Sequence, residues 1–189
     1  MVNNMLEKIY KIYENTKDIK YSWIDKNGDI HEHISDGYIK KFMMQTPEEI
    51  QKSKIGNCWE TVELTRYLLD KENIPNETYF FSIPMQNFYC HSIIVAQVNN
   101  KYYWIENSFK DNKGIHEYTD LSQLFFDILD KFPQIVGSKK VKYSQMKIYN
   151  YEKPQNHIGC IEFYLYCLRQ KNITKKYLPN YIELIEEKK

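Results

Sequence analysis

Three side chains have the types and the order that acyl transfer through a thiol requires. Cys58 follows a glycine in the stretch Gly56-Asn57-Cys58-Trp59, His91 lies 33 residues later, and Glu106 lies another 15 residues on. In such chemistry a thiolate attacks a carbonyl, an imidazole exchanges a proton with the thiol, and a carboxylate orients the imidazole and stabilises its charged form. The three residues together predict a Cys-His-Glu triad that reacts through a thioester.

The residues around Cys58 predict that its thiol lies at the start of a helix. Asn57 is a favourable N-cap residue, and Glu60, three positions later, completes a variant of the capping box. The helix is expected to run to about Lys71. Free backbone N–H groups and the positive end of the helix dipole meet at such a start, and they favour a thiolate and an oxyanion there.

His91 is expected on a buried strand that a tight turn joins to its partner strand. Residues 89–98 form a nearly continuous apolar run, which is typical of a central strand. Asn99-Asn100 suits a two-residue hairpin turn, because asparagine tolerates positive φ. Residues 101–109 then form the return strand.

This register selects the residue that would orient His91. Side chains alternate between the two faces of a strand, so His91 and Glu106 become diagonal neighbours on one face. Asn107, which would suit a Cys-His-Asn triad, points to the other face, as does Cys90. We therefore expect Glu106 to contact His91 and Cys90 to be a buried packing residue. Cys160 and Cys167, which are seven residues apart, are expected to be core residues.

The rest of the chain predicts one α+β domain over residues 1–189, with a core at about 46–132. Helices are expected over 2–15, from Thr46, over 121–132 up to Pro133, over 160–169 and from Leu178; strands over 20–25, 30–34, 77–84 and 142–151; and a polar loop over 111–116. The N-terminal helix and hairpin and the C-terminal strand and helix are additions to the core.

Composition limits the classes of function. Lys and Arg total 26 against 25 Asp and Glu, so the net charge of +1 gives no electrostatic case for binding nucleic acid. No apolar stretch approaches the length of a membrane span. The four cysteines form no CxxC motif, and the polar N-terminus does not resemble a secretion signal. We expect a cytoplasmic protein with reduced thiols.

The order of these motifs resembles the transglutaminase-like cysteine enzymes of the papain-like superfamily. The resemblance covers about residues 54–118 and rests on Gly56-x-Cys58, on His91 at the head of an apolar strand, and on Lys-Tyr-Tyr-Trp-Ile-Glu at 101–106. A bacterial branch with Gly-x-Cys-Trp, Trp-x-Glu and Gly-Ile-His-Glu-Tyr, here 114–118, is the narrower resemblance. The family usually carries Asp where this chain has Glu106.

The resemblance implies a papain-like fold in which the Cys58 helix packs against an antiparallel sheet that carries His91 and Glu106. It implies thioester chemistry on an amide, with no metal and no cofactor. The Cys58 backbone N–H would be one oxyanion donor, and Gln51, on the N-terminal side of the cysteine, is a candidate for the second. Trp59, Trp104 and His116 are candidates to line the substrate site.

The expected activity is that of a thiol hydrolase, such as a protease or deamidase, acting on a protein or peptide-like amide. Amine transfer is the other outcome of the same chemistry. Two alternatives to this activity stay open. One is a catalytically inactive binding module on the same fold, and the other is an arylamine N-acetyltransferase-like enzyme. The second is disfavoured by Glu106 in place of Asp and by the lack of a recognisable coenzyme-binding sequence.

Overall fold

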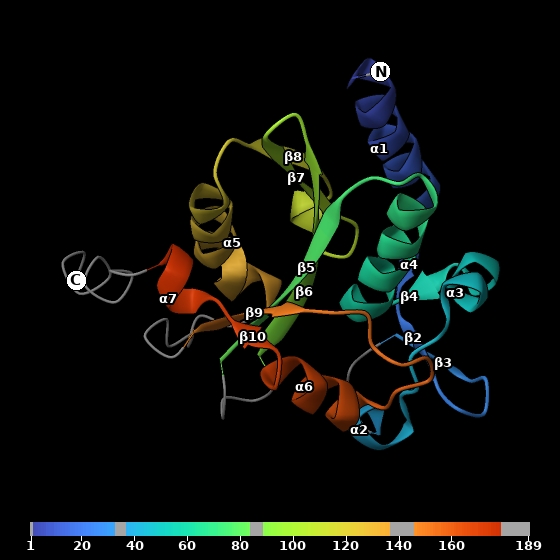
Figure 1. The fold of residues 1–189 in the computed structure, drawn as a ribbon. Coiled ribbons are helices and arrows are strands. Elements are labelled where there is room, and N and C mark those ends of the chain that lie inside the picture. Colours follow the sequence, from blue (N-terminus) through green and yellow to red (C-terminus); the bar gives the residue numbers. More distant parts are fainter. Residues whose placement is uncertain (1, 33–36, 84–88, 137–145, 179–189) are drawn as a thin grey trace.

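A six-stranded antiparallel sheet forms the centre of the fold (Figure 1). The computed structural model describes residues 2–32, 37–83, 89–136 and 146–178. From one edge to the other the strands are β10 (Lys171–Asn172), β9 (Lys147–Tyr151), β5 (Asn76–Ser82), β6 (Cys90–Val98), β7 (Lys101–Glu106) and β8 (Gly114–Tyr118). Each neighbouring pair is antiparallel. The predicted α+β class and antiparallel sheet are therefore confirmed.

Helices cover both faces of this sheet (Figure 1). α1 (Val2–Thr16) and α4 (Cys58–Lys71) lie on one face, and α5 (Leu121–Ile135) lies on the other. Ile94, Ala96 and Ile105 pack on the α4 side, whereas Ile93, Val95 and Trp104 pack on the α5 side. Because both faces are covered, β6 is buried at most positions, and this explains its apolar run from Ile93 to Ala96.

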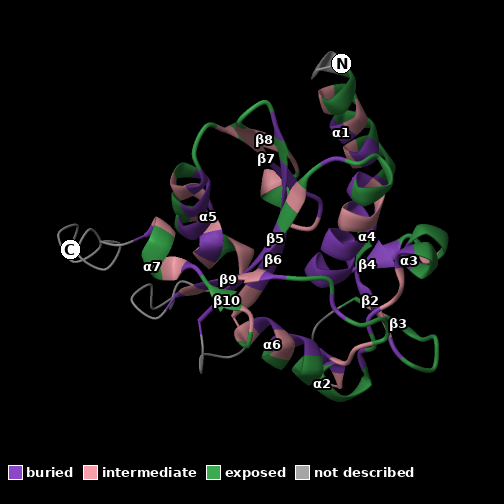
Figure 2. Ribbon diagram, in the orientation of Figure 1, coloured by how far each residue is buried: buried purple, intermediate pink, exposed green. Residues whose placement is uncertain are grey.

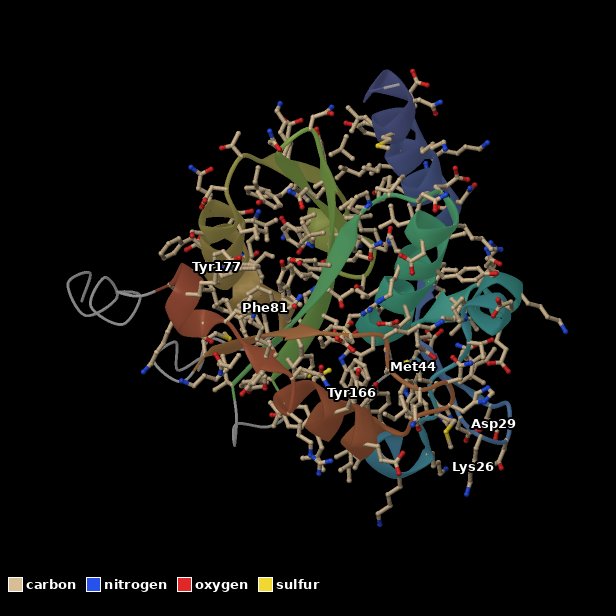
Figure 3. The ribbon with its side chains drawn as sticks, viewed as in Figure 1. Lys26, Asp29, Met44, Phe81, Tyr166 and Tyr177 are labelled. Carbon is tan, nitrogen blue, oxygen red and sulfur yellow. The ribbon has the colours of Figure 1, made fainter. Side chains whose placement is uncertain are left out.

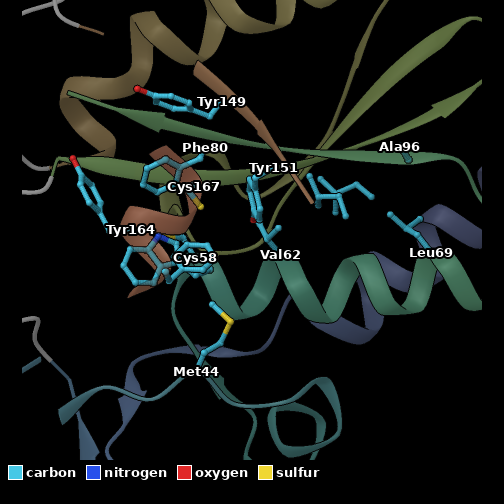
Figure 4. Packing of buried hydrophobic residues seen from close by; sticks show 14 of the residues in the cluster. Met44, Cys58, Val62, Leu69, Phe80, Ala96, Tyr149, Tyr151, Tyr164 and Cys167 are labelled. Atoms are coloured by element: carbon cyan, nitrogen blue, oxygen red, sulfur yellow. The ribbon is translucent and has the colours of Figure 1, made fainter. Parts of the chain in front are cut away.

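The helix that begins with Cys58 is anchored along its length by the α4-side cluster. Figure 4 shows Val62 and Leu69 on this helix facing Phe80, Ala96 and Tyr151 of the sheet. Figure 2 shows that the start of α4 is buried like the sheet itself. The predicted packing of the cysteine-bearing helix on an antiparallel sheet is confirmed.

The hairpin between β6 and β7 has the predicted turn. Asn99 and Asn100 have φ values of 55° and 58°, the left-handed region that asparagine tolerates. Val98 pairs with Lys101, and the pairing continues to Ile94 and Ile105. The predicted register is thus confirmed. It places His91 shortly before the paired part of β6 and Glu106 directly after the paired part of β7.

The N-terminal region adds short strands and helices beside the start of α4. β1 (Lys20–Tyr21) pairs in parallel with β4 (Ile55–Gly56), and β2 (Trp23–Ile24) pairs with β3 (Ile30–His31). Lys26 and Asp29, in the turn of this second pair, extend from the edge of the molecule, far from the buried Phe81 (Figure 3). α2 (Tyr38–Lys41) packs against α6 (Cys160–Leu168), and α3 (Pro47–Ser53) begins at Thr46 with the predicted capping box.

Several predicted boundaries are wrong. The expected loop at 111–116 is instead a short 3-10 helix, η1 (Lys110–Asn112), followed by β8, because Gly114–Tyr118 finds a partner in β7. β7 ends at Glu106 rather than at 109. α5 continues through Pro133 to Ile135: the proline removes a single N–H near the helix end, and Phe132 stays fully buried.

The C-terminal region contributes more to the sheet than expected. β9 and β10 extend the sheet beyond β5, and α7 (Thr174–Tyr177) follows them; β10 and α7 are not predicted from the sequence. The expected start of a strand at 142 and the expected helix after Leu178 lie outside the described residues. Among the helices that the structure describes, none has both the length and the apolarity needed to cross a membrane.

Candidate active site

Cys58 is the first residue of α4, and the cap of that helix is built as predicted. The Asn57 side-chain oxygen accepts hydrogen bonds from the backbone N–H of Trp59 at 2.9 Å and of Glu60 at 3.1 Å. The Glu60 carboxylate accepts the Asn57 N–H at 3.0 Å, which completes the capping box. The Asn57 amide also donates to the Tyr38 hydroxyl at 2.8 Å. The cap therefore fixes the backbone on both sides of the thiol.

Glu60 ties this cap to the chain that precedes α3. Its carboxylate accepts the backbone N–H of Gln45 at 3.0 Å and the side-chain amide of Gln45 at 3.1 Å. Burial raises the pKa of Glu60 to about 7, even though the donors from Gln45 and Asn57 oppose this rise. Glu60 is thus a bracing residue at the start of the helix and takes no direct part in the contacts of Cys58.

His91 and Glu106 form a buried pair. The Nε2 atom of His91 lies 2.8 Å from Oε2 of Glu106, and the two side chains are 3% and 2% exposed. The other carboxylate oxygen accepts the backbone N–H groups of Ser108 at 2.7 Å and of Phe109 at 2.9 Å, and the Ser108 hydroxyl at 2.9 Å. Four donors therefore hold the carboxylate in one orientation toward the imidazole.

The charges of this pair reinforce each other. Burial alone would lower the pKa of His91, but the negative charge of Glu106 and hydrogen bonds to Cys58 and Glu106 raise it to about 10. Burial alone would raise the pKa of Glu106, but the His91 charge and the hydrogen bonds from His91, Phe109 and Ser108 lower it. At neutral pH the pair is an imidazolium beside a carboxylate.

The same imidazole reaches Cys58. Hydrogen bonding with Cys58 is among the influences that raise the pKa of His91, and because Nε2 contacts Glu106, Nδ1 is the ring nitrogen left to exchange a proton with the thiol. The pairing of β6 with β7 extends from the turn as far as Ile94 and Ile105, and His91 lies beyond that point. This is the end of the sheet where α4 begins. The structure thus brings together the three residues that the sequence singles out.

A cavity of about 360 Å³ opens beside the thiol. Aromatic and aliphatic side chains dominate its lining, which consists of Tyr21, Tyr38, Ile39, Asn57, Cys58, Trp59, Tyr89, Cys90, Ile135, Val136 and Cys160. Trp59 lines it as expected and also packs on Phe163, with ring centroids 4.5 Å apart. Cys160 and Cys167 belong to the buried core as expected, and Cys90 packs against that core; Cys90 and Cys160 also line the cavity.

The other expected lining residues lie elsewhere. Gln51 is exposed on α3 and does not line the cavity, because α3 turns Pro47 and Ile50 inward instead. Trp104 is fully buried on the α5 side of the sheet, and His116 of β8 stacks on it with ring centroids 4.7 Å apart. These three assignments are therefore corrected: Trp104 packs in the α5-side cluster rather than beside Cys58, and β8 pairing places His116 opposite Trp104.

Asn107 faces away from His91, as the register predicts. Its side-chain amide donates to the Thr65 hydroxyl at 3.2 Å, and its carbonyl oxygen accepts from the Thr16 hydroxyl at 3.3 Å. All three residues are buried. Asn107 therefore connects β7 to α4 and α1, and its amide is not available to orient the imidazole.

Two tyrosines at the site are missing from the sequence-based expectations. Tyr21 on β1 and Tyr38 on α2 both line the cavity beside Cys58. Tyr21 is the second residue of β1, and a strand of only two residues leaves no periodic pattern that predicts its partner strand. The Tyr38 contact with Asn57 depends on tertiary packing alone.

Comparisons with known proteins bear on this arrangement. The profile of a family described as a transglutaminase-like domain matches residues 2–125. The search of curated proteins finds no match. Among solved structures, Legionella pneumophila LapG is similar with a TM-score of 0.40 and 14% sequence identity, over 60% of this chain and 57% of LapG.

Proposed function

Because the chain belongs to the transglutaminase-like family, we propose that it is a cysteine-dependent enzyme that cleaves an amide through a thioester on Cys58. The observation that carries this proposal is the 2.8 Å contact between His91 and Glu106 next to the thiol. Cys58 is the nucleophile, His91 the acid and base, and Glu106 the group that orients and charges the imidazole.

In the first half of the reaction, the Cys58 thiolate attacks the amide carbonyl carbon. A C–S bond forms, and the C=O π electrons move to oxygen. As the oxyanion collapses, the C–N bond breaks, and the amine leaves with a proton from His91 Nδ1. The products of this half are a thioester on Cys58 and a neutral imidazole that still faces Glu106.

In the second half, His91 takes a proton from water as the water oxygen attacks the thioester carbonyl. The C–S bond breaks, the carboxylic acid is released, and the thiolate–imidazolium pair is restored. We propose water as the acceptor, because no Asp or Glu lines the described cavity to attract a cationic amine. A protease or deamidase is thus favoured over an amine transferase.

The cavity beside Cys58 supports a substrate class. Seven of its lining side chains are aromatic or aliphatic: Tyr21, Tyr38, Ile39, Trp59, Tyr89, Ile135 and Val136. We propose that the substrate is a protein or peptide amide with a bulky apolar side chain near the scissile bond, because burying such a side chain contributes about 1.5–3 kcal/mol.

A panel of fluorogenic peptide amides tests this function. Wild type is expected to cleave those with Phe, Leu or Tyr before the scissile bond faster than those with Asp or Lys. Cys58→Ala is expected to abolish cleavage, and Cys160→Ala, which removes another thiol of the same cavity, is expected to retain it. Equal activity in Cys58→Ala would overturn the proposal.

One observation favours a second candidate function, that of a binding module without catalysis. Cys58 is only 8% exposed, so its thiol has limited access to solvent. This alternative predicts that Cys58 resists small acylating reagents although the cavity binds an apolar peptide. Acetylation of Cys58 by acetyl-coenzyme A would instead support the acetyltransferase-like reading.

A further inference from the structure

Tyr21 is held beside Cys58 by a contact between segments far apart in the sequence. β1 and β4 pair in parallel, and the register places Tyr21 opposite Gly56, two residues before Cys58. The Lys20 N–H donates to the Lys54 carbonyl at 2.9 Å, which extends this pairing. The position of Tyr21 is thus tied to the backbone that leads into the nucleophile.

The side chain of Tyr21 is directed at the thiol. It lines the same cavity as Cys58, and the Cys58 thiol is close enough to its hydroxyl to contribute, by charge and by hydrogen bonding, to the raised pKa of Tyr21. The residue as a whole is 43% exposed, whereas its hydroxyl is desolvated. Desolvation of that hydroxyl, followed by the nearby Cys58, Cys90 and Glu106, raises the pKa of Tyr21 well above its usual value. The hydroxyl therefore remains a hydrogen-bond donor at working pH.

We propose that the Tyr21 hydroxyl is the second oxyanion donor of this site, together with the Cys58 backbone N–H. This inference rests on the proposed thioester chemistry. A carbonyl oxygen that becomes an oxyanion during attack lies next to the sulfur, within reach of a donor that already contacts the sulfur. When substrate binds, the Tyr21 hydroxyl shifts its hydrogen bond from Cys58 to that oxygen.

Other side-chain donors of the described cavity are directed at partners other than Cys58. The Tyr38 hydroxyl lies at the helix cap, where it accepts the Asn57 amide at 2.8 Å, and the Trp59 indole N–H is directed at Cys90. Gln51, the glutamine expected for this role, is exposed on α3 and outside the cavity lining. Tyr21 is the donor that combines a backbone-fixed position, a place in the cavity wall and a direct contact with the nucleophile.

Two reactions of Cys58 separate an oxyanion donor from a residue that merely activates the thiol. p-Nitrophenyl acetate acylates a thiolate through a tetrahedral oxyanion, whereas iodoacetamide alkylates it by direct displacement without one. Tyr21→Phe is the test variant, because it removes only the hydroxyl of a partly exposed ring and should fold. Tyr10→Phe, on the exposed face of α1, is the matched control.

For Tyr21→Phe, we expect the rate constant of the p-nitrophenolate burst to fall about 10²–10³-fold, with KM little changed. The iodoacetamide rate at Cys58 is expected to stay within about threefold of wild type, and Tyr10→Phe is expected to match wild type in both reactions. Unchanged acylation in Tyr21→Phe, or equal losses in both reactions, would overturn the oxyanion role while leaving the proposed function intact. A wild-type protein that shows no burst at Cys58 would overturn the proposed function and this inference with it.

Discussion

The Nε2 atom of His91 lies 2.8 Å from Oε2 of Glu106, and both side chains are almost completely buried. The backbone N–H groups of Ser108 and Phe109 bind the other carboxylate oxygen of Glu106 immediately after β7 ends. The carboxylate is therefore held by its own loop and directed at the imidazole.

Glu106→Gln tests the charge of this carboxylate. The substitution removes the largest influence that raises the pKa of His91, and burial then lowers that pKa. The imidazolium is lost near neutral pH, so acylation by p-nitrophenyl acetate is expected to fall about 10²-fold or more. Glu106→Asp keeps the charge and should lose far less. Equal rates in wild type and Glu106→Gln would rule out an electrostatic role for Glu106.

The His91–Glu106 pair predicts a stability profile. The pKa of His91 is about 10 in the folded protein, above its reference value of 6.5, so its stabilising contribution is complete below about pH 6.5 and is lost as pH rises toward 10. In a Cys58→Ala background, which removes the thiol and its share of this rise, Glu106 still raises the pKa of His91, so Tm is expected to fall as pH rises above about 6.5.

The control for this profile is the same background with His91→Leu and Glu106→Leu added. This protein lacks both titrating groups and leaves neither one buried without its partner. Its Tm should decline less over the same pH range, as measured by thermal unfolding followed by circular dichroism. Parallel curves for the two proteins would show that the pair does not titrate as described.

Asn57→Ala tests the cap that positions the nucleophile. It removes the acceptor for the Trp59 and Glu60 N–H groups, and the free energy of unfolding is expected to drop by about 1–2 kcal/mol in urea. Asn57→Asp keeps the cap and should lose less. Acylation of Cys58 is also expected to slow in Asn57→Ala, in contrast to Thr46→Ala, which removes the cap of α3. A slowdown of the same size in Thr46→Ala would disprove a local effect on Cys58.

Asn107→Ala distinguishes a Cys-His-Glu triad from a Cys-His-Asn triad. The variant leaves the buried hydroxyls of Thr65 and Thr16 without this partner, and it is expected to destabilise the protein by about 1–3 kcal/mol. The burst rate per folded molecule should remain close to that of wild type. A loss of acylation like that of Glu106→Gln would show that Asn107, rather than structure alone, serves the reaction.

Local sequence signals predict the parts of the site that depend on neighbouring residues. The Asn57–Glu60 capping box lies within four residues and appears as expected. The Asn99-Asn100 turn sets the register of β6 and β7, and the register distinguishes Glu106 from Asn107. The local turn thus determines that Glu106, rather than Asn107, meets His91.

Contacts between distant segments decide what the sequence does not predict. The β1–β4 pairing that presents Tyr21 to the site joins two strands of two residues each, too short to show alternation. β8 is similar, because Gly114–Tyr118 becomes a strand only through pairing with β7. This pairing holds His116 opposite Trp104, on the far side of the sheet from Cys58. A loop without a pairing partner would not constrain His116 in this way.

The most direct test of the account is the rate of iodoacetamide alkylation at each cysteine, read by mass spectrometry, in wild type and His91→Ala. Burial raises the pKa of Cys160 to about 12, so this thiol of the same cavity serves as an internal control. At pH 6 a free thiol, with a pKa of about 8.5, is almost entirely protonated. The account predicts that Cys58 is alkylated rapidly at this pH in wild type, slowly in His91→Ala, and faster than Cys160 in wild type. A Cys58 that is as inert as Cys160, or equally reactive with and without His91, would contradict the proposed nucleophile.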